Sequence, residues 1–332
     1  MKTDILKGEA GIAEAVRLLR DEQVVALPTE TVYGLAGDAR SPLAVGRIYA
    51  AKARPSNRPL IVHVADAERV SDWASEIPDC LAALADAFWP GPLTVVLKRS
   101  PAVPDAVSAG LETIALRVPE HPVFRAVLEA VGTGLAAPSA NPYQALSPTT
   151  AEQALDGLQG RIPAVLEGGP CALGLESTIL DLTAETPRVL RAGPITASEI
   201  ARRIGRPVAH PEAHDAVVPG NVKAHYQPRT PLQLTPVNRE SIEQAAAETA
   251  FMVWSEGARH QLTRSGVAPE FRWVMPERSG DYAQALYNTL FRIDQSAAKA
   301  ILVEPPPTGE AWRGVLDRLT RSQHRASDTS VD

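Results

Sequence analysis

The first two hundred residues alternate between two hydrophobic patterns. Apolar residues between positions 12 and 19 recur at helical spacing, and the short apolar run 24–27, closed by Pro28, is typical of a buried strand. A second helical pattern lies at 124–131, and this alternation of helices with strands predicts an α/β layer fold. Since 164–191 has no room for crossover helices, its strands should pair antiparallel in a twisted, mixed sheet. Further apolar runs predict strands at 60–64, 93–97, 114–118, 164–166, 178–182 and 189–190.

The hydrophobic pattern changes after residue 205. A helical segment at 197–204 ends at Gly205, and prolines at 207, 211, 219, 228 and 231 then interrupt any regular element. Beyond them, apolar runs at 250–254 and 300–303, with helical patterns between and after them, predict a small α/β, Rossmann-like domain. We therefore predict a first domain over 1–205, a proline-rich linker over 206–231, a second domain over 232–320 and a polar tail over 321–332.

Composition narrows the classes of protein. The 332 residues are 45% hydrophobic and 22% charged, enough for two domains with a large core, and this excludes a disordered chain. The net charge of -6 disfavours general DNA binding, because the molecule as a whole repels phosphate. Two cysteines are too few for a disulfide framework or a cysteine zinc site. Without an apolar run long enough to span a bilayer, the sequence predicts a cytoplasmic protein with no membrane partner.

One local charge anomaly stands out between residues 39 and 65. Five basic residues occur there without an acid, in a domain that is otherwise acidic. An ordinary solvated helix face is one interpretation. The other is an anion site, since Pro55 and Pro59 fix the loop that holds Arg54 and Arg58, and held guanidinium groups grip phosphate oxygens in pairs. The basic residues are Arg40, Arg47, Lys52, Arg54 and Arg58.

Other candidate chemistry is less specific when each segment is taken alone. The hydroxyl and amide groups at 137–141 and 147–149 could surround an anion, but Ser147 or Thr149 could equally cap the helix that runs through Leu158. His63 lies in an apolar strand, where a histidine is more often a hydrogen-bonded core residue. The sequence contains no Walker loop, no metal-ligand spacing of histidines and no nucleophile elbow, which disfavours covalent catalysis.

Several motifs, taken in order, carry a resemblance to a known family. In the first domain these are Pro28-Thr29-Glu30-Thr31-Val32-Tyr33-Gly34-Leu35, Lys52-Ala53-Arg54-Pro55 with Pro59-Leu60, Leu116-Arg117-Val118-Pro119, Ser139-Ala140-Asn141, Ser147-Pro148-Thr149, Glu176-Ser177-Thr178-Ile179 and Val189-Leu190-Arg191-Ala192-Gly193. Later motifs are Pro219-Gly220 with His225-Tyr226 and Pro228, and Leu302-Val303-Glu304-Pro305-Pro306-Pro307. The chain resembles, over nearly its whole length, the YrdC-type threonylcarbamoyl-AMP synthases in their long form, which has an extra C-terminal domain.

The resemblance implies an activity and a set of ligands. Such enzymes join L-threonine, bicarbonate and ATP, with Mg²⁺, into threonylcarbamoyl adenylate and pyrophosphate, which a separate transferase then uses to modify tRNA. In this chain the family's threonine-binding positions are Thr31, His63, Arg117 and Ser177. The ATP-binding positions are Lys52, Arg54, Arg58, Thr113, Ser139, Asn141, Ser147, Arg191 and Tyr226. Because the threonine amine is itself the nucleophile, the resemblance implies no catalytic residue beyond those that position reactants and stabilise charge.

This chain departs from the family's pattern at one position, and its linker contains more than a spacer needs. The family often has Asn immediately before the Pro-Leu pair, whereas this chain has Arg58 there, preceded by Asn57. The linker combines proline stiffness with two ring side chains, His225 and Tyr226, which is more than a spacer requires. We therefore predict that the linker is a lid that excludes water from the hydrolysable intermediates, with Tyr226 over the nucleotide.

Two rival interpretations come from other classes of protein. One is RNA binding without catalysis, through a concave basic surface around Arg47, Lys52, Arg54 and Arg58, which predicts salt-sensitive RNA affinity and no ATP turnover. The other is the carbamoyltransferase family of hydrogenase maturation, whose members contain a related domain. Those proteins carry cysteine-rich zinc modules, which Cys80 and Cys171 cannot supply.

Overall fold

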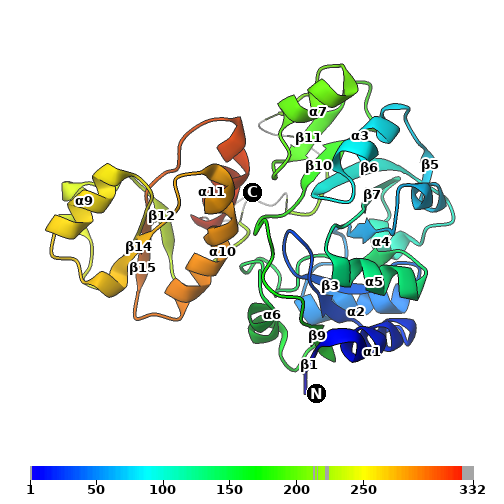
Figure 1. The fold of residues 1–332 in the computed structure, drawn as a ribbon, viewed down its shortest axis with the longest axis horizontal. Coiled ribbons are helices and arrows are strands. Elements are labelled where there is room, and N and C mark those ends of the chain that lie inside the picture. The colour runs from blue at the N-terminus through cyan, green and yellow to red at the C-terminus, as the bar shows by residue number, and fades with distance from the viewer. Residues whose placement is uncertain (1, 212–213, 215, 221–223, 324–332) are drawn as a thin grey trace. The chain divides into compact units, whose positions relative to one another are not determined.

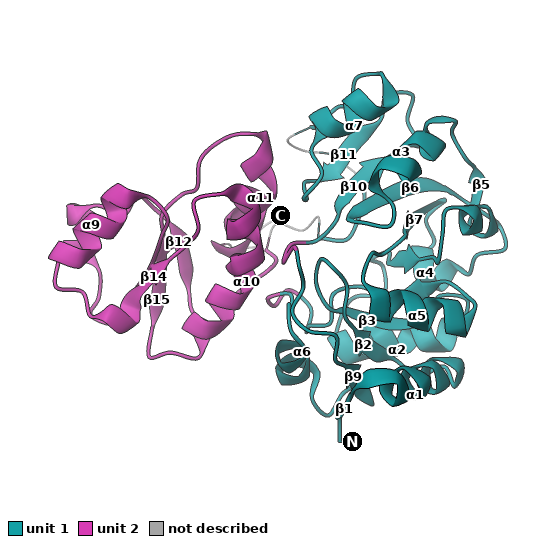
Figure 2. Ribbon diagram, in the orientation of Figure 1, with its two compact units in different colours: residues 1–143, 147–172, 176–221 teal, residues 144–146, 173–175, 222–332 magenta. Residues whose placement is uncertain are grey.

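A computed structural model describes residues 2–211, 214, 216–220 and 224–323. The chain divides into two compact units, drawn in different colours in Figure 2. Unit 1 comprises residues 1–143, 147–172 and 176–221, and unit 2 comprises 144–146, 173–175 and 222–332. The division therefore falls within the predicted linker, and two short segments of the predicted first domain belong to unit 2.

Unit 1 is built on an eleven-stranded sheet, in the order β1-β9-β2-β3-β8-β4-β7-β6-β10-β11, with β5 paired to β6 (Figure 1). Its strands are β1 (Asp4–Leu6), β2 (Val25–Leu27), β3 (Gly34–Asp38), β4 (Ile61–His63), β5 (Ala74–Glu76), β6 (Leu93–Arg99), β7 (Thr113–Arg117), β8 (Leu135–Ala136), β9 (Ala164–Leu166), β10 (Thr178–Asp181) and β11 (Arg188–Arg191). Its helices are α1 (Gly8–Arg20), α2 (Pro42–Lys52), η1 (Glu68–Asp72), α3 (Cys80–Phe88), α4 (Asp105–Ser108), α5 (Pro122–Val131), α6 (Ala151–Leu158) and α7 (Ala197–Ile204).

The sheet is mixed, as the sequence predicts. β10 and β11 pair antiparallel, which confirms part of the prediction for residues 164–191. The prediction was wrong for β9, which pairs parallel with β1 and β2 and lies at the other end of the sheet from β10. The residues between β9 and β10 form no helix, so a long irregular connection, rather than a hairpin, separates these two strands.

Each face of the sheet has a different cover. One face packs its apolar side chains against α2, α3, α4, α6 and α7, as shown by Ile48, Leu84 and Ile200 in one core cluster. On the opposite face, α1 and α5 cover the part formed by β2, β3, β8 and β9, with Phe124 and Leu19 fully buried (Figure 1). In the part of the chain that the structure describes, no helix packs on the rest of this second face. That part of the second face therefore has no helical cover among the described residues.

The helix boundaries around this face follow local capping chemistry. The α5 helix begins at Pro122, with the His121 side chain accepting a hydrogen bond from the Val123 backbone N–H, and it ends at Gly132 in a left-handed conformation. The α6 helix is capped by Thr150, whose side chain accepts from the Gln153 N–H, so the predicted caps, Ser147 and Thr149, were wrong. Ser147 and Thr149 are both buried, which leaves Ser147 available for other contacts.

Residues 206–220 of the predicted linker belong to unit 1. Ala209 forms a bridge with Arg188 of β11, and His214 Nε2 lies 2.8 Å from the Leu190 carbonyl oxygen. Val218 is buried on the uncovered part of the second face, in a cluster with Ala216 at its edge. The segment 216–220 is therefore a cover of the sheet, although it has no regular structure. The cluster beneath it consists of Ile61, Val96, Ala115, Ile179 and Leu190, which we call the apolar strip.

Unit 2 has a four-stranded sheet in the order β12-β15-β13-β14, with every neighbouring pair parallel. This is the Rossmann-like α/β arrangement that the sequence predicts. The last helix continues to Gln323, so residues 321–323 of the predicted tail are helical, while 324–332 lie outside the described residues. Among the described helices, none is long and apolar enough to cross a membrane. The elements are β12 (Leu232–Leu234), α8 (Arg239–Gln244), β13 (Thr249–Val253), α9 (Glu256–Arg264), η2 (Pro269–Phe271), β14 (Arg272–Val274), α10 (Ser279–Asp294), β15 (Ala300–Val303), η3 (Glu310–Trp312) and α11 (Arg313–Gln323).

Candidate active site

Three neighbouring strands place polar side chains in one row on the part of the second face that no described helix covers. In the parallel pair β4 and β7, His63 lies opposite Arg117. In the antiparallel pair β6 and β7, Val95 lies opposite Leu116, which sets Thr94 opposite Arg117. Side chains alternate between faces along a strand, so all three point to the same side as the apolar strip. We call His63, Arg117 and Thr94 the polar row, and its members are at most 4% exposed.

Arg117 is held at the end of β7 by three hydrogen bonds. Its Nε donates to the Gly91 carbonyl at 3.1 Å, its Nη1 donates to the Thr31 hydroxyl at 3.0 Å, and its Nη2 forms an ion pair with Glu30. The second carboxylate oxygen of Glu30 accepts the Glu120 backbone N–H at 3.1 Å. These contacts use three of the five N–H donors of the guanidinium group, so two are left to bind an anion.

Ser177 joins the polar row at Thr94. The two hydroxyl oxygens are 2.7 Å apart. Arg191 makes three hydrogen bonds to Ser177: its Nη2 donates to the hydroxyl at 3.0 Å and to the backbone carbonyl at 2.9 Å, and its Nε donates to the same carbonyl at 3.0 Å. The structure thus brings together Thr31 with Arg117, and Ser177 with Arg191.

His63 is a neutral base in this setting. Burial, with a further contribution from the Arg117 charge, lowers the pKa of His63 to about 3. Its ring lies 5.2 Å from the ring of Phe124 in α5, and its Nδ1 has no hydrogen-bond partner among the described residues. An unpartnered buried nitrogen next to Arg117 is suited to a ligand group, which agrees with the assignment of His63 to threonine.

Lys52 and Arg54 lie at the end of α2 and are buried, not solvated. The Lys52 ammonium donates to the carbonyl oxygens of Ser139 and Asn141 at 2.5 and 2.6 Å. Burial, with the Arg54 charge adding to it, holds the pKa of Lys52 well below its usual range, while Glu176 opposes this shift. Arg54 donates to the Pro59 carbonyl at 3.1 Å. The structure therefore brings four predicted ATP residues together, Lys52 and Arg54 with Ser139 and Asn141. We call Lys52 and Arg54 the basic group.

Ser147 and Glu176 form a buried pair beside this basic group. The Ser147 hydroxyl donates to a Glu176 carboxylate oxygen at 2.5 Å, and the two residues are 0% and 6% exposed. An ionised carboxylate only accepts, so the Ser147 hydrogen is committed to Glu176. Ser147 Oγ can therefore offer lone pairs to a ligand, whereas a direct donation from this hydroxyl to phosphate would first require the bond to Glu176 to break.

The roles of three further predicted ATP residues are not tested by the contacts that the structure shows. Thr113 begins β7 and pairs with Lys98, so three residues, or roughly 13 Å of strand, separate it from Arg117 at the other end. Arg58 is half-buried, and its backbone carbonyl accepts from the Tyr49 hydroxyl. Tyr226 belongs to unit 2, where its ring lies 5.1 Å from the Arg318 guanidinium and 6.0 Å from the Tyr287 ring. Its assignment to ATP stays a prediction.

The basic segment divides into two kinds of residue. Arg40 donates to the Asp72 carbonyl and lies over the Trp73 ring, and Arg47 donates to the Glu22 carbonyl, so both have structural partners. Lys52 and Arg54 are only 1% and 9% exposed. Two of the four members of the predicted basic surface for RNA are therefore not on the surface, which disfavours this rival interpretation.

Three functional candidates were missed at the level of sequence. Thr94 is a polar residue within an otherwise apolar run, and Glu30 is a charged residue immediately after a buried strand. Both features are visible in the sequence, but neither shows which residue the side chain contacts in the fold. Glu176 precedes β10 in the same way. Their partners, Ser177, Arg117 and Ser147, are 83, 87 and 29 residues away.

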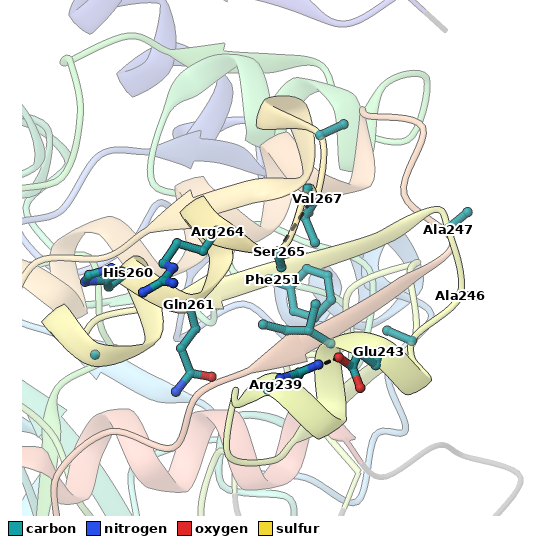
Figure 3. Close-up of a pocket in the computed structure, with 15 residues that line it drawn as sticks. Arg239, Glu243, Ala246, Ala247, Phe251, His260, Gln261, Arg264, Ser265 and Val267 are labelled. Atoms are coloured by element: carbon teal, nitrogen blue, oxygen red, sulfur yellow. Dashed lines mark hydrogen bonds and ion pairs between the residues drawn. The ribbon is translucent and has the colours of Figure 1, made fainter.

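A hollow of about 1060 Å³ in unit 2 contains none of the predicted site residues. It lies between α8 and α9, over the buried ring of Phe251 (Figure 3). Arg239 at its rim is already paired with Glu243 at 2.6 Å. The candidate active site is therefore the polar row of unit 1 with the neighbouring basic group, not this hollow.

Comparison with known proteins identifies the family. A family model described as telomere recombination, which groups the Sua5, YciO and YrdC proteins, matches residues 17–193, and the model of the threonylcarbamoyl-AMP synthase C-terminal domain matches residues 195–323. The chain belongs to the threonylcarbamoyl-AMP synthase family. Both models match in order, which confirms the long form of the family with its C-terminal domain.

Individual relatives agree over nearly the whole chain. The threonylcarbamoyl-AMP synthase of Bacillus subtilis is 37% identical over 325 residues, which cover 94% of this chain and 92% of that protein. The synthase of Pyrococcus abyssi is 34% identical over 93% of this chain and 92% of its own. The crystal structure of P. abyssi Sua5 complexed with L-threonine has a TM-score of 0.85 at 31% identity, covering 97% of this chain and 98% of that chain. The predicted fold and enzyme class are confirmed.

Proposed function

We propose that the polar row of unit 1 binds L-threonine and that the basic group beside it binds ATP, so that the chain makes threonylcarbamoyl-AMP and pyrophosphate from threonine, bicarbonate and ATP. The observation that carries this proposal is the register of β4, β7 and β6, which sets His63, Arg117 and Thr94 side by side on the face that no described helix covers. The threonine bound in the related P. abyssi protein supports it.

Threonine has a carboxylate, an amine and a hydroxyl, and the site offers a partner for two of them. The two remaining N–H donors of Arg117 match a carboxylate, which a planar guanidinium binds in pairs. The hydroxyls of Thr31 and Ser177 can recognise the threonine hydroxyl. A site that hydrogen-bonds a substrate hydroxyl rejects analogues that lack it, because buried polar groups would then be left unpaired. Valine should therefore be a poor substrate.

Contacts that connect the two groups support a position for ATP. Arg191 binds Ser177 of the threonine group and is itself a predicted ATP residue, so the two ligands would meet at this side chain. Lys52, Arg54 and Arg191 supply positive charge, and the apolar strip lies between the polar row and Thr113. We propose that the phosphates of ATP lie beside Arg191, Lys52 and Arg54, next to the polar row.

The reaction then needs positioning more than covalent chemistry. The threonine amine adds to carbon dioxide with loss of a proton, or to bicarbonate with loss of water, and forms a carbamate. A carbamate oxygen then attacks the α-phosphorus of ATP, and the bond from this phosphorus to the bridging oxygen breaks so that pyrophosphate leaves. Arg191 and Lys52 would stabilise the negative charge that gathers at phosphorus. The role of the protein is to align two charged substrates and to exclude water from the carbamate and the mixed anhydride.

We propose that Mg²⁺ enters with ATP. The described residues contain no group of three or more His, Cys, Asp or Glu side chains that could hold a metal ion. Mg²⁺ keeps several waters and commonly binds through substrate phosphates with one or two carboxylates, of which Glu176 is the one buried next to the predicted ATP residues. The product is a substrate for a separate transferase that modifies tRNA, so contact with tRNA is indirect.

A pyrophosphate assay tests the proposed function. The full chain, given labelled ATP, bicarbonate and Mg²⁺, should release pyrophosphate only when threonine is added, and the nucleotide product should carry the threonine label. Omission of bicarbonate should abolish the signal. Salt-sensitive RNA binding without ATP turnover would instead support the rival interpretation.

Substitutions in the basic group should affect one substrate selectively. Arg54→Ala and Lys52→Ala should raise the KM for ATP at least tenfold, because each removes a charge-assisted contact worth about 1.5–3 kcal/mol. Threonine binding measured by calorimetry without nucleotide should change less than twofold. Arg47→Ala is the matched control, since Arg47 lies on the same helix and donates to the Glu22 carbonyl at 2.6 Å. Equal losses for both substrates would mean that the basic group has only a structural role.

A further inference from the structure

Thr94 and Ser177 form the most completely defined hydrogen-bond group in the candidate site. Both side chains are buried, with 0% and 1% exposure. Thr94 is the second residue of β6, and Ser177 directly precedes β10, its parallel neighbour. The hydroxyl oxygens are 2.7 Å apart, a distance at which one of them must donate its hydrogen to the other.

The two possible directions of this hydrogen bond differ in which hydrogen is left over. Among the described residues, the Ser177 hydroxyl is the only hydrogen-bond partner of the Thr94 side chain. If Ser177 donates to Thr94, the Thr94 hydrogen has no acceptor, and if Thr94 donates to Ser177, the Ser177 hydrogen has none, so either direction leaves one buried hydrogen for a ligand. The proposed function assigns Ser177, and not Thr94, to threonine, which makes Thr94 the donor.

This donation fixes what Ser177 can offer to a ligand. Ser177 Oγ accepts one hydrogen bond from Thr94 and another from Arg191 Nη2, a group that can only donate. Both lone pairs of Ser177 Oγ are then occupied. Its own hydrogen has no acceptor among the described residues, so it must point to a group that the chain does not supply. Ser177 is thus a donor, and its partner is an oxygen, not an ammonium group.

We propose that Thr94 is a positioning residue for substrate recognition: it makes Ser177 a hydrogen-bond donor to the side-chain hydroxyl oxygen of threonine. This inference rests on the proposed function. The carboxylate of threonine is already matched by the two remaining donors of Arg117, which leaves the hydroxyl oxygen as the acceptor for Ser177. The amino acid selected at this position belongs to the class with a β-hydroxyl group.

The test compares threonine with its deoxy analogue, L-2-aminobutyrate, in the full-length enzyme. Thr94→Val keeps the shape of the side chain and removes the hydroxyl. We expect kcat/KM for threonine to fall between tenfold and a hundredfold, kcat/KM for L-2-aminobutyrate to change less than threefold, and the KM for ATP to stay within twofold. The preference for threonine over its analogue should therefore fall by the same factor as kcat/KM for threonine. Thr94→Ser should restore most of it, because it restores the hydroxyl.

Two controls separate this role from a structural one. Thr249→Val, another buried threonine, in β13 of unit 2 and 3% exposed, should leave the preference unchanged. If Thr94→Val keeps the preference for threonine while its melting temperature is native, the inference is wrong. If the unmodified enzyme shows no threonine-dependent pyrophosphate release, the proposed function fails instead. The inference is then judged by calorimetry alone: an unchanged ratio of the dissociation constants for threonine and L-2-aminobutyrate in Thr94→Val overturns it.

Discussion

Arg117→Ala should lower the free energy of unfolding by about 3–5 kcal/mol and abolish threonine use, because it leaves the Glu30 carboxylate buried without its partner. Both members of this ion pair are 4% exposed, and Glu30 has no other charged partner among the described residues. Urea unfolding would measure the loss of stability, and threonine-dependent pyrophosphate release would measure the loss of function. The two effects have different causes, so a second variant is needed to separate them.

The double variant Glu30→Gln with Arg117→Ala separates stability from function. Neutralising Glu30 removes the unpaired charge, so we expect most of the lost stability to return, while threonine use stays lost because no guanidinium is present to bind the carboxylate. The surface pair Lys98–Glu76, also on the sheet and more than half exposed, is the matched control. Lys98→Ala should cost at most about 1 kcal/mol. Recovery of threonine use in the double variant would remove Arg117 from the binding site.

Much of the fold could be predicted because its signals are local. The predicted strand at 114–118 has only apolar residues before Arg117, and the helix at 197–204 stops at a glycine, so the predicted bounds of both lie within about a residue of the observed β7 and α7. Strand β3 was missed, because its run Gly34–Asp38 contains two glycines and an acid and does not have the composition of a strand. Short, glycine-rich strands form only because neighbours on both sides pair with them.

The arrangement of the site could not be predicted, since it depends on strand order. His63, Arg117 and Thr94 form one row only because β4, β7 and β6 are adjacent, an order that no local pattern in the sequence specifies. The motif resemblance supplied Arg117 and His63 without their geometry. It included Glu30 in its first motif without a role and did not include Thr94, and the importance of both appears only when their partners are seen across the sheet.

Part of the predicted lid, the segment 216–220, belongs to unit 1. Releasing it from the sheet is the second change for which we expect a large effect. Val218 is buried on the apolar strip at 6% exposure, and the Pro219 carbonyl accepts from Arg191 Nη1 at 3.2 Å. These contacts place the segment 216–220 on the apolar strip and tie it to Arg191, a predicted ATP residue. A cover in this position can exclude water from the carbamate and the anhydride, as the linker chemistry predicts.

Val218→Asp should release this cover, because a carboxylate cannot stay against Ile61 and Ala115 without a partner. We expect ATP to be converted to AMP and pyrophosphate while the yield of threonylcarbamoyl-AMP per pyrophosphate falls severalfold, since water now reaches the intermediates. Val217→Asp is the matched control: its side chain is 38% exposed, so the same charge one residue away should leave the yield unchanged. A yield in Val218→Asp equal to that of the control would show that the segment only packs on the sheet and does not protect the reaction.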